Sequence, residues 1–379
     1  MSIPFNKPYL TGTEFEHISQ ALISRKLSGD GEFTFRCQSY FEKRFNFAKS
    51  LLTTSCTDAL EMASILCDIK PGDEVIAPSY TFVSTVNAFA LRGAKIIFAD
   101  SSNENPNLDV EALPELISNK TKAIIPVHYA GVACDMGPIL SLAKEYGLYV
   151  IEDAAQAFDS FYKGKSLGSL GQFSTFSFHE TKNIICGEGG MLVVNDEKYI
   201  ARAEIIREKG TNRSAFFRGE VDKYGWVDIG SSFLPSDILA SMLYAQFLES
   251  ELIQKRRVEI WQRYWDVLNV LNANALAQLP NIPEYATNNG HMFYLVCRNV
   301  KERGNLISYL KENGIQAVFH YQSLHKSRFF EGMHDDRVLG NADRYTDCLL
   351  RLPLYFELEN EQIDYIATCI LQFYGLAKN

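Results

Sequence analysis

Between residues 50 and 151, short apolar runs alternate with amphipathic segments, and this alternation restricts the possible folds more than any other feature of the chain. The apolar runs are typical of strands that are buried on both faces of a sheet, and the segments between them have helical spacing. The predicted strands are 50–53, 74–77, 95–99, 123–127 and 148–151, and the predicted helices are 58–67, 83–91, 110–117 and 136–146. The pattern predicts an α/β fold with a mainly parallel sheet.

Two helices are expected before this region. Residues 13–16 read Thr-Glu-Phe-Glu, the spacing of a capping box, which predicts a helix that begins there and ends at Ser28 and Gly29. The apolar spacing of residues 33–45 predicts the second helix.

The pattern changes after residue 172. Residues 173–178 alternate as a strand, residues 187–190 form a glycine-rich turn, and residues 191–194 are a second strand. Residues 200–228 are rich in Arg, Lys and Gly, and we expect them to be mostly irregular or loosely helical.

A second, smaller domain is expected at the C-terminus. A long helical stretch at 236–274 leads into an α+β pattern with strands at 291–297 and 317–319, a helix at 304–313 and a final helix from residue 361. We therefore predict a large domain at 1–245, which includes the N-terminal helices, and a small domain at 246–379.

The composition excludes several classes of protein. The 37 Lys and Arg residues stand against 46 Asp and Glu, and a net charge of −9 gives no general attraction to nucleic acid or to anionic membranes. No apolar run is long enough to span a membrane, and the first residues lack the pattern of a secretory signal. We expect a cytoplasmic protein with reduced cysteines and, since its histidines show no ligand spacing, no metal site.

The residues that follow the predicted strands are the first candidates for a site, because ligands of open α/β sheets bind beyond the carboxyl ends of the strands. Ser55 and Thr57 open a helix after the first strand, where free N–H groups can bind an anion, although a plain N-cap explains the same residues. Phe82 follows the second strand and either covers a flat ligand or fills the core. Glu152 and Asp153 directly follow the fifth strand, and a carboxylate buried there needs a cationic partner, although acids at a helix N-terminus explain the same residues.

Lys182 completes this set. It follows a strand and precedes the glycine-rich turn, the setting of a lysine that forms a Schiff base, although a single lysine is more often a surface group. A phosphate cradle, an aromatic cover, a strand-end carboxylate and a lysine together are what pyridoxal phosphate (PLP) requires.

Five stretches of the chain then resemble the sugar aminotransferases of the DegT/DnrJ/EryC1/StrS family, which have the aspartate aminotransferase fold (fold type I). They are 71–76 (PGDEVI), 78–85 (PSYTFVST), 126–131 (PVHYAG), 152–156 (EDAAQ) and 177–183 (SFHETKN), in the family's order. The resemblance covers nearly the whole chain.

The resemblance implies the roles of the cofactor-binding residues. Lys182 matches the Schiff-base lysine, Asp153 the partner of the pyridine nitrogen, and Gln156 the group beside the phenolic oxygen. Phe82 matches the aromatic ring stacked on the cofactor. The implied phosphate contacts are Thr57, Asp58 (through its backbone) and Ser177.

One departure from the family pattern occurs at residues 230–234. Many members have Gly-x-Asn-x-Arg here, and their Asn reaches the cofactor phosphate of the other subunit, whereas this chain offers Ser232. The same resemblance implies a homodimer with shared active sites. Arg213, Arg218 and Lys223 are candidates to bind the substrate diphosphate, although such residues are also typical of a solvated surface.

The activity implied is transfer of an amino group from L-glutamate to C4 of a nucleotide-linked 4-keto-6-deoxyhexose. Residues 207–232 are most similar to the branch that forms the galacto amine. The alternatives are the gluco epimer, a C3 keto-sugar transaminase, a PLP-dependent sugar dehydratase, and a non-catalytic regulatory protein on the same fold. Lys182 argues against the dehydratase branch, in which a histidine replaces it, and the intact Lys182, Asp153 and Gln156 argue against a non-catalytic protein.

Overall fold

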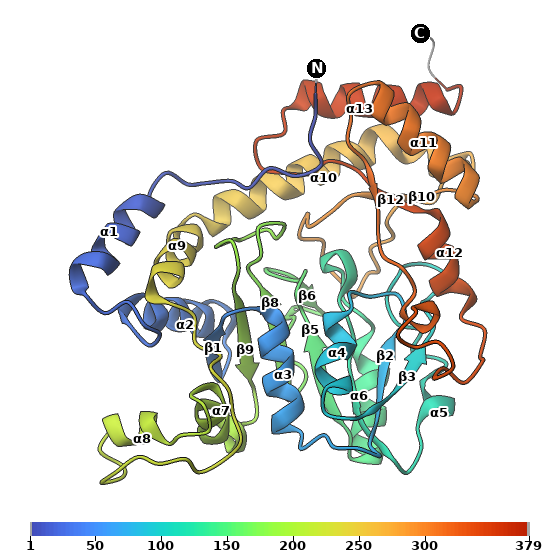
Figure 1. Ribbon diagram of the computed structural model, residues 1–379. Coiled ribbons are helices and arrows are strands. Elements are labelled where there is room, and N and C mark those ends of the chain that lie inside the picture. Colours follow the sequence, from blue (N-terminus) through green and yellow to red (C-terminus); the bar gives the residue numbers. More distant parts are fainter. Residues whose placement is uncertain (1, 377–379) are drawn as a thin grey trace.

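A seven-stranded sheet forms the centre of the computed structural model, which describes residues 2–376 (Figure 1). Its strand order is β1-β9-β8-β5-β4-β2-β3. The strands are β1 (Lys49–Thr53), β2 (Glu74–Pro78), β3 (Lys95–Ala99), β4 (Thr121–Ile124), β5 (Tyr149–Asp153), β8 (Phe173–Ser177) and β9 (Gly190–Val194). Strand β9 is antiparallel to β1 and β8, and every other neighbouring pair is parallel, which confirms the mainly parallel sheet.

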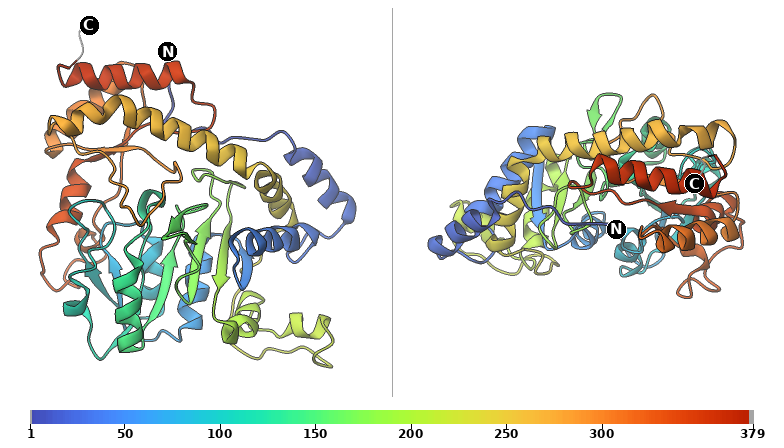
Figure 2. Two further views of the ribbon diagram at one scale, coloured as in Figure 1. Left: turned by 180° about the vertical axis from the view of Figure 1, so that it is seen from behind. Right: turned by 90° about the horizontal axis from the view of Figure 1, so that it is seen from above.

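Helices cover both faces of this sheet (Figures 1 and 2). One face packs against α3 (Cys56–Leu66), α4 (Ser84–Ala90) and α7 (Ile200–Arg207). The other packs against α2 (Glu32–Phe45), α6 (Met136–Tyr146) and α9 (Asp237–Leu248). Consecutive strand residues such as Leu51 and Leu52 lie in different cores, which explains why the strands are apolar throughout.

A second sheet, of order β10-β12-β11, forms the C-terminal part with its own core. Its elements are α10 (Ser250–Ala273), β10 (Tyr294–Val296), α11 (Val300–Glu312), β11 (Val318–Phe319), α12 (Gly340–Cys348), β12 (Leu349–Arg351) and α13 (Asn360–Phe373). Ile3 joins this core and bridges to Ile315, so the N-terminus lies against the C-terminal part (Figure 1). The domain boundary at residue 245 falls inside α9 and stays a prediction.

The first helix differs from the sequence prediction. Helix α1 (Glu14–Ser24) ends before Ser28, with Arg25 in the left-handed region at a φ of 57°. The Thr13 side chain forms no cap, so the capping box is wrong. The buried Glu14 carboxylate instead accepts the N–H groups of Thr11 and Gly12, at 2.8 and 2.9 Å, and so satisfies the backbone just before the helix.

The bounds of three other predicted helices also differ from those in the structure. The stretch predicted as one helix at 236–274 is two helices, α9 and α10, separated at Glu249. The predicted helix at 110–117 shrinks to α5 (Leu113–Leu116), because Ile117 is already extended. Helix α11 starts earlier than expected, where the Asn299 side chain accepts the N–H of Glu302. Within residues 2–376, no helix has both the length and the apolar character needed to cross a bilayer.

Three further short elements belong to the large part of the fold, and one of them lies in a segment that we expected to be irregular or loosely helical. They are the paired strands β6 (Phe161–Tyr162) and β7 (Lys165–Ser166), and α8 (Arg213–Phe217). Helix α8 extends with α7 from one edge of the sheet (Figure 1). This position keeps α8 away from the carboxyl ends of β5 and β8 in the same chain.

Candidate active site

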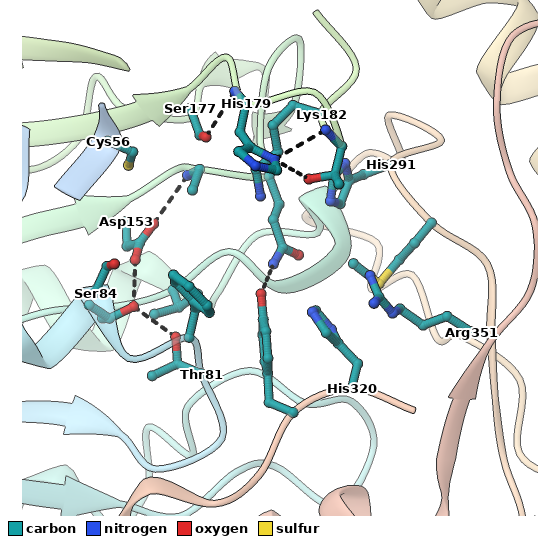
Figure 3. Close-up of a pocket in the computed structure, with 18 of the residues that line it drawn as sticks. Cys56, Thr81, Ser84, Asp153, Ser177, His179, Lys182, His291, His320 and Arg351 are labelled. Carbon is teal, nitrogen blue, oxygen red and sulfur yellow. Dashed lines mark hydrogen bonds between the residues drawn. The ribbon is translucent and has the colours of Figure 1, made fainter. Parts of the chain in front are cut away.

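A cavity of about 400 Å³ lies at the carboxyl ends of β5 and β8 (Figure 3). We call it the lysine cavity, because Lys182 lines it. Asp153 and Ser177, the last residues of the two strands, contribute to its sheet side. The C-terminal part contributes the opposite wall, which includes His320 and Arg351. The cavity therefore forms where the two parts of the chain meet.

The start of α3 supplies backbone donors to this cavity. Ser55 caps the helix by accepting the N–H of Asp58 at 3.1 Å. Cys56 and Thr57, which follow it, line the cavity and carry N–H groups of the first helical turn, which have no intrahelical partner. A Cβ atom on Gly190 would lie 2.4 Å from the nitrogen of Cys56, so only glycine lets β9 approach so closely. This is the geometry of an anion site at a helix N-terminus.

Asp153 is held in place by hydrogen bonds from α4 and from its own loop. Its Oδ2 accepts the Thr85 hydroxyl at 2.7 Å, and the Thr85 oxygen is 2.8 Å from that of Thr81 (Figure 3). Its Oδ1 accepts the N–H of Ala155 at 3.1 Å. The side chain is almost completely buried yet lines the cavity, so it presents a fixed negative charge to whatever binds there.

The neighbouring carboxylate, Glu152, points to the other face of β5. It is fully buried, and its Oε2 lies 3.0 Å from the Nε2 of His128. It also accepts the N–H groups of Gly168, Leu170 and Gly171 at 2.7–2.8 Å. Of the two strand-end acids, Glu152 is thus the one with a basic partner, and it fixes the loop before β8.

Lys182 has an unusual electrostatic setting. Burial lowers the pKa of its amine below the ordinary value of 10.5, and the positive charge of Arg351 lowers this pKa further. Asp153 and Cys56 act in the opposite direction. The neutral amine is therefore easier to reach than on a surface lysine, and the neutral form is the one that attacks a carbonyl or takes a proton.

Gln156 and Phe82 complete the predicted set in the lysine cavity. Gln156 accepts the N–H of Ala130 at 2.6 Å and donates to the Tyr321 hydroxyl at 3.1 Å, so its side chain is fixed. Phe82 lines the cavity although its side chain is 54% exposed, and its ring lies 6.0 Å from that of Tyr321. An exposed ring beside a cavity suits a flat ligand.

These residues fit PLP. The cavity combines an amine of lowered pKa, an oriented carboxylate, free backbone donors and an exposed aromatic ring. Within residues 2–376, no group of three or more His, Cys, Asp or Glu side chains is arranged to hold a metal ion.

The family model for the DegT/DnrJ/EryC1/StrS aminotransferase family matches residues 8–371. The chain belongs to this family. GDP-perosamine synthase of Escherichia coli O157:H7 is 33% identical over 374 residues, which are 98% of this chain and 99% of that protein. The structure of DesV from S. venezuelae in complex with a ketimine intermediate is 25% identical with a TM-score of 0.90, over 100% of both chains. The PMP form of Spr1654 from Streptococcus pneumoniae is also 25% identical with a TM-score of 0.90, over 99% of both chains.

The protein is thus a PLP-dependent sugar aminotransferase of fold type I that acts on nucleotide-linked keto sugars. Of the residues predicted for the family's cofactor, Lys182, Asp153, Gln156, Phe82, Thr57 and Ser177 all line the lysine cavity. Asp58 does not line it, and its N–H group is already bonded to Ser55.

The other predicted residues lie elsewhere. Ser232, Arg213 and Arg218 line a second cavity of about 820 Å³, which we call the basic cavity. Both arginines form ion pairs, Arg213 with Glu208 at 3.2 Å and Arg218 with Glu204 at 2.9 Å. Lys223 is exposed and is not among the residues that line either cavity. These four residues are not brought to Lys182 within one chain.

Sequence reasoning identified no residue of the C-terminal wall. His291, His320 and Arg351 line the lysine cavity, but they lie more than 100 residues after Lys182 and reach it only by tertiary packing. No local pattern identifies them. Thr81 and Thr85 could have been found, because hydroxyls four residues apart beside a strand end can bond to each other and to a carboxylate.

Proposed function

We propose that this aminotransferase moves an amino group from L-glutamate to C4 of dTDP-4-keto-6-deoxy-D-glucose and releases dTDP-4-amino-4,6-dideoxy-D-galactose. The observation that carries the proposal is the pairing of Lys182 and Asp153 in one cavity, on opposite sides of a space that fits PLP. Bound PLP supplies an aldehyde that takes up an amino group and a ring that spreads the charge of a deprotonated carbon.

Lys182 is proposed as the residue that binds the cofactor aldehyde and then moves a proton at the reacting carbon. Its lowered pKa supports both roles, because each needs a neutral amine. Asp153 is proposed to hold the proton on the pyridine nitrogen, and its hydrogen bonds to Thr85 and Ala155 support that role by keeping the carboxylate oriented.

The remaining contacts to the cofactor are proposed from the placement of their side chains. Thr57 and Ser177, beside the start of α3, would hold the phosphate, with a smaller part for the shared N–H of Asp58. Gln156 would lie beside the phenolic oxygen and Phe82 over the ring face. Replacement of Thr57, Ser177, Gln156 or Phe82 should therefore lower cofactor affinity more than protein stability.

The choice of sugar rests on the resemblance of residues 207–232 to dTDP-4-amino-4,6-dideoxygalactose transaminase. A product of this kind would serve synthesis of lipopolysaccharide or enterobacterial common antigen in the cytoplasm. The 33% identity to GDP-perosamine synthase makes a GDP-linked sugar a second candidate substrate. The gluco epimer and a C3 keto sugar remain the alternatives for the acceptor carbon.

The test is to incubate the enzyme with glutamate and dTDP-4-keto-6-deoxyglucose, or its GDP-linked counterpart, and to identify the product by NMR. We expect an axial amine at C4, with small couplings from H4 to both H3 and H5. Large couplings to both protons would identify the gluco epimer and contradict the galacto assignment. The yellow absorbance of the purified protein tests the non-catalytic alternative, for which no cofactor spectrum would be seen.

We also propose that two subunits share each active site. The support is that Ser232, Arg213 and Arg218 line the basic cavity rather than the lysine cavity of their own chain. In a homodimer these residues, with Lys223, would serve the partner's cofactor phosphate and the substrate diphosphate.

Hybrid dimers test the sharing of sites. Lys182→Ala and Arg218→Ala should each be inactive alone, and a mixture of the two should recover activity because one site of each hybrid is intact. No recovery after proven subunit exchange between two inactive parents would contradict the proposal. Lys255→Ala is the matched control, because it removes an exposed cation from α10, far from the residues in question. This variant should be active by itself, without mixing.

A further inference from the structure

Lys182 lies outside the strands of the central sheet. It falls in the irregular segment between the end of β8 and the start of β9, where no strand fixes the backbone. Its own N–H donates to the carbonyl oxygen of His179 at 2.9 Å. The residue that follows it is Asn183, whose side chain is almost completely buried. What holds Asn183 therefore also holds the chain beside the lysine.

The side chain of Asn183 is bonded to three residues of the C-terminal part. Its Nδ2 donates to the Oε1 of Gln254, on α10, at 2.8 Å and to the backbone carbonyl of Asn289 at 2.9 Å. Its Oδ1 lies 2.8 Å from the Nδ1 of His291. His291 lines the lysine cavity together with Lys182 (Figure 3). The network thus connects the chain next to the lysine with the C-terminal wall of the cavity.

These bonds also determine which nitrogen of His291 carries the hydrogen. A backbone carbonyl can only accept, so the Asn183 atom that faces Asn289 is the amide nitrogen, and the atom that faces His291 is the oxygen. This oxygen has no hydrogen to donate, so the Nδ1 of His291 is the donor. Burial lowers the pKa of His291 well below its ordinary value of 6.5, and the charges of Lys182 and Arg257 lower it further. The ring is therefore neutral, with its hydrogen on Nδ1 and a lone pair on Nε2.

Asn289 extends the network to a second residue that lines the cavity. Its Nδ2 donates to the carbonyl oxygens of Gln156 and Phe158 at 2.8 and 2.9 Å. Its Oδ1 accepts the N–H of His291 at 3.0 Å. A Cβ atom on Gly131 would lie 2.0 Å from this oxygen, so only glycine leaves room for the amide. The network therefore also holds the backbone of Gln156, whose side chain lines the lysine cavity.

We infer that Asn183 and His291 are positioning residues for Lys182. His291, as the neutral ring with its hydrogen on Nδ1, orients the amide of Asn183, and this amide holds the chain beside the lysine. The lysine matters here through its proposed role in binding the cofactor aldehyde, on which this inference rests. Both residues affect the rate through the placement of the lysine amine, because a displacement of about 1 Å at a reacting group can lower a rate by about 100-fold.

Two replacements of His291 separate the roles of its two nitrogens. Asn places an amide N–H close to the position of Nδ1, whereas Gln places its amide close to that of Nε2. His291→Asn should retain kcat within a few-fold, because the bond to Asn183 can still form. His291→Gln should lower kcat by about 10-fold, the equivalent of one buried hydrogen bond, with little change in KM. The visible absorbance of the PLP-loaded enzyme reports the geometry at the lysine amine, and the pH at which it changes should shift only in His291→Gln.

The other possible patterns overturn the inference. A loss of kcat in His291→Asn but not in His291→Gln would show that the ring contacts a ligand directly through Nε2. Equal losses in both variants would show that the bond through Nδ1 is not what matters. Wild-type behaviour of both variants would remove His291 from the placement of Lys182.

Asn183→Ala tests the other member of the pair against a matched control. Asn195→Ala also removes a side-chain amide, which donates to the carbonyl oxygens of Gly168 and Gly171 at 2.7 and 2.9 Å and is not among the residues that line the lysine cavity. Both variants should have a lower melting temperature. Only Asn183→Ala should also lower kcat, by about 10-fold or more, and shift the absorbance titration. A lower melting temperature with unchanged kcat and titration would give Asn183 a structural role alone and overturn the inference.

The hydrogen on His291 can be located without measuring activity. In PLP-loaded enzyme that contains isotope-labelled histidine, nitrogen NMR distinguishes the two neutral forms of the ring, and His291→Asn identifies the signal. We expect the hydrogen on Nδ1 at neutral pH, and a hydrogen on Nε2 alone or a charged ring would overturn the inference. Borohydride labelling separates the two claims. A cofactor mass on another lysine of the wild type would refute the proposed role of Lys182, whereas a label on Lys182 with unchanged kcat in Asn183→Ala would refute the positioning role alone.

Discussion

Two adjacent carboxylates at the end of β5 have opposite surroundings. Asp153 lines the lysine cavity and accepts two hydrogen bonds, but within residues 2–376 it forms no ion pair, whereas Glu152 is buried on the other face of β5 and bonded to His128 and three backbone N–H groups. The strand alternation that sends neighbouring side chains to opposite faces produces this difference. Asp153 on one face of β5 lies in the lysine cavity, and Glu152 on the other face holds the loop before β8 in place.

Replacement of Asp153 should have the largest effect on turnover. Asp153→Asn keeps the shape but removes the charge proposed to hold the pyridine proton, so we expect kcat to fall on the order of 10²-fold or more. The urea midpoint should stay close to that of wild type. Activity within a few-fold of wild type would remove Asp153 from the proposed mechanism.

Thr85 should give an intermediate effect, because it acts only through Asp153. Thr85→Val removes the 2.7 Å hydrogen bond to the carboxylate and should lower kcat by about 10-fold, the equivalent of one charge-assisted bond. The same replacement in an Asp153→Asn background should lower kcat by a much smaller factor. Additive losses in the double variant would show that Thr85 acts by another route.

Glu152 should hardly affect turnover of the folded enzyme. Glu152→Gln weakens a buried network of four hydrogen bonds, and we expect the free energy of unfolding to fall by about 2–4 kcal/mol. Glu145→Gln, on the exposed side of α6, is the control and should change neither property. A loss of kcat comparable to that of Asp153→Asn would break the distinction between the two faces.

The smallest expected effect concerns the cofactor-free protein. The lowered pKa of Lys182 means that the unfolded chain binds its proton more tightly, which penalises folding at neutral pH. Lys182→Met should therefore raise the melting temperature of cofactor-free protein at pH 7. The difference in melting temperature between this variant and wild type should become smaller as the pH rises towards 10.5, the ordinary pKa of a lysine. A gap that widens with pH would contradict the assigned direction of the shift.

The same comparison shows what the sequence could predict. The parallel sheet and the residues after its strands followed from local patterns, since strand order along the chain places Thr57, Asp153 and Lys182 at one edge. Which of Glu152 and Asp153 faces the cavity required the family resemblance, because alternation gives opposite faces but does not say which face is open. His320 and Arg351 come from a separate sheet whose docking leaves no trace in local sequence.

The central claim is that Lys182 binds the cofactor in the lysine cavity. Borohydride reduction of the purified yellow protein, followed by digestion and peptide mass spectrometry, tests it directly. We expect one labelled peptide with the cofactor mass on Lys182, and no label in Lys182→Ala. A cofactor mass fixed to any other lysine would contradict the account of the site.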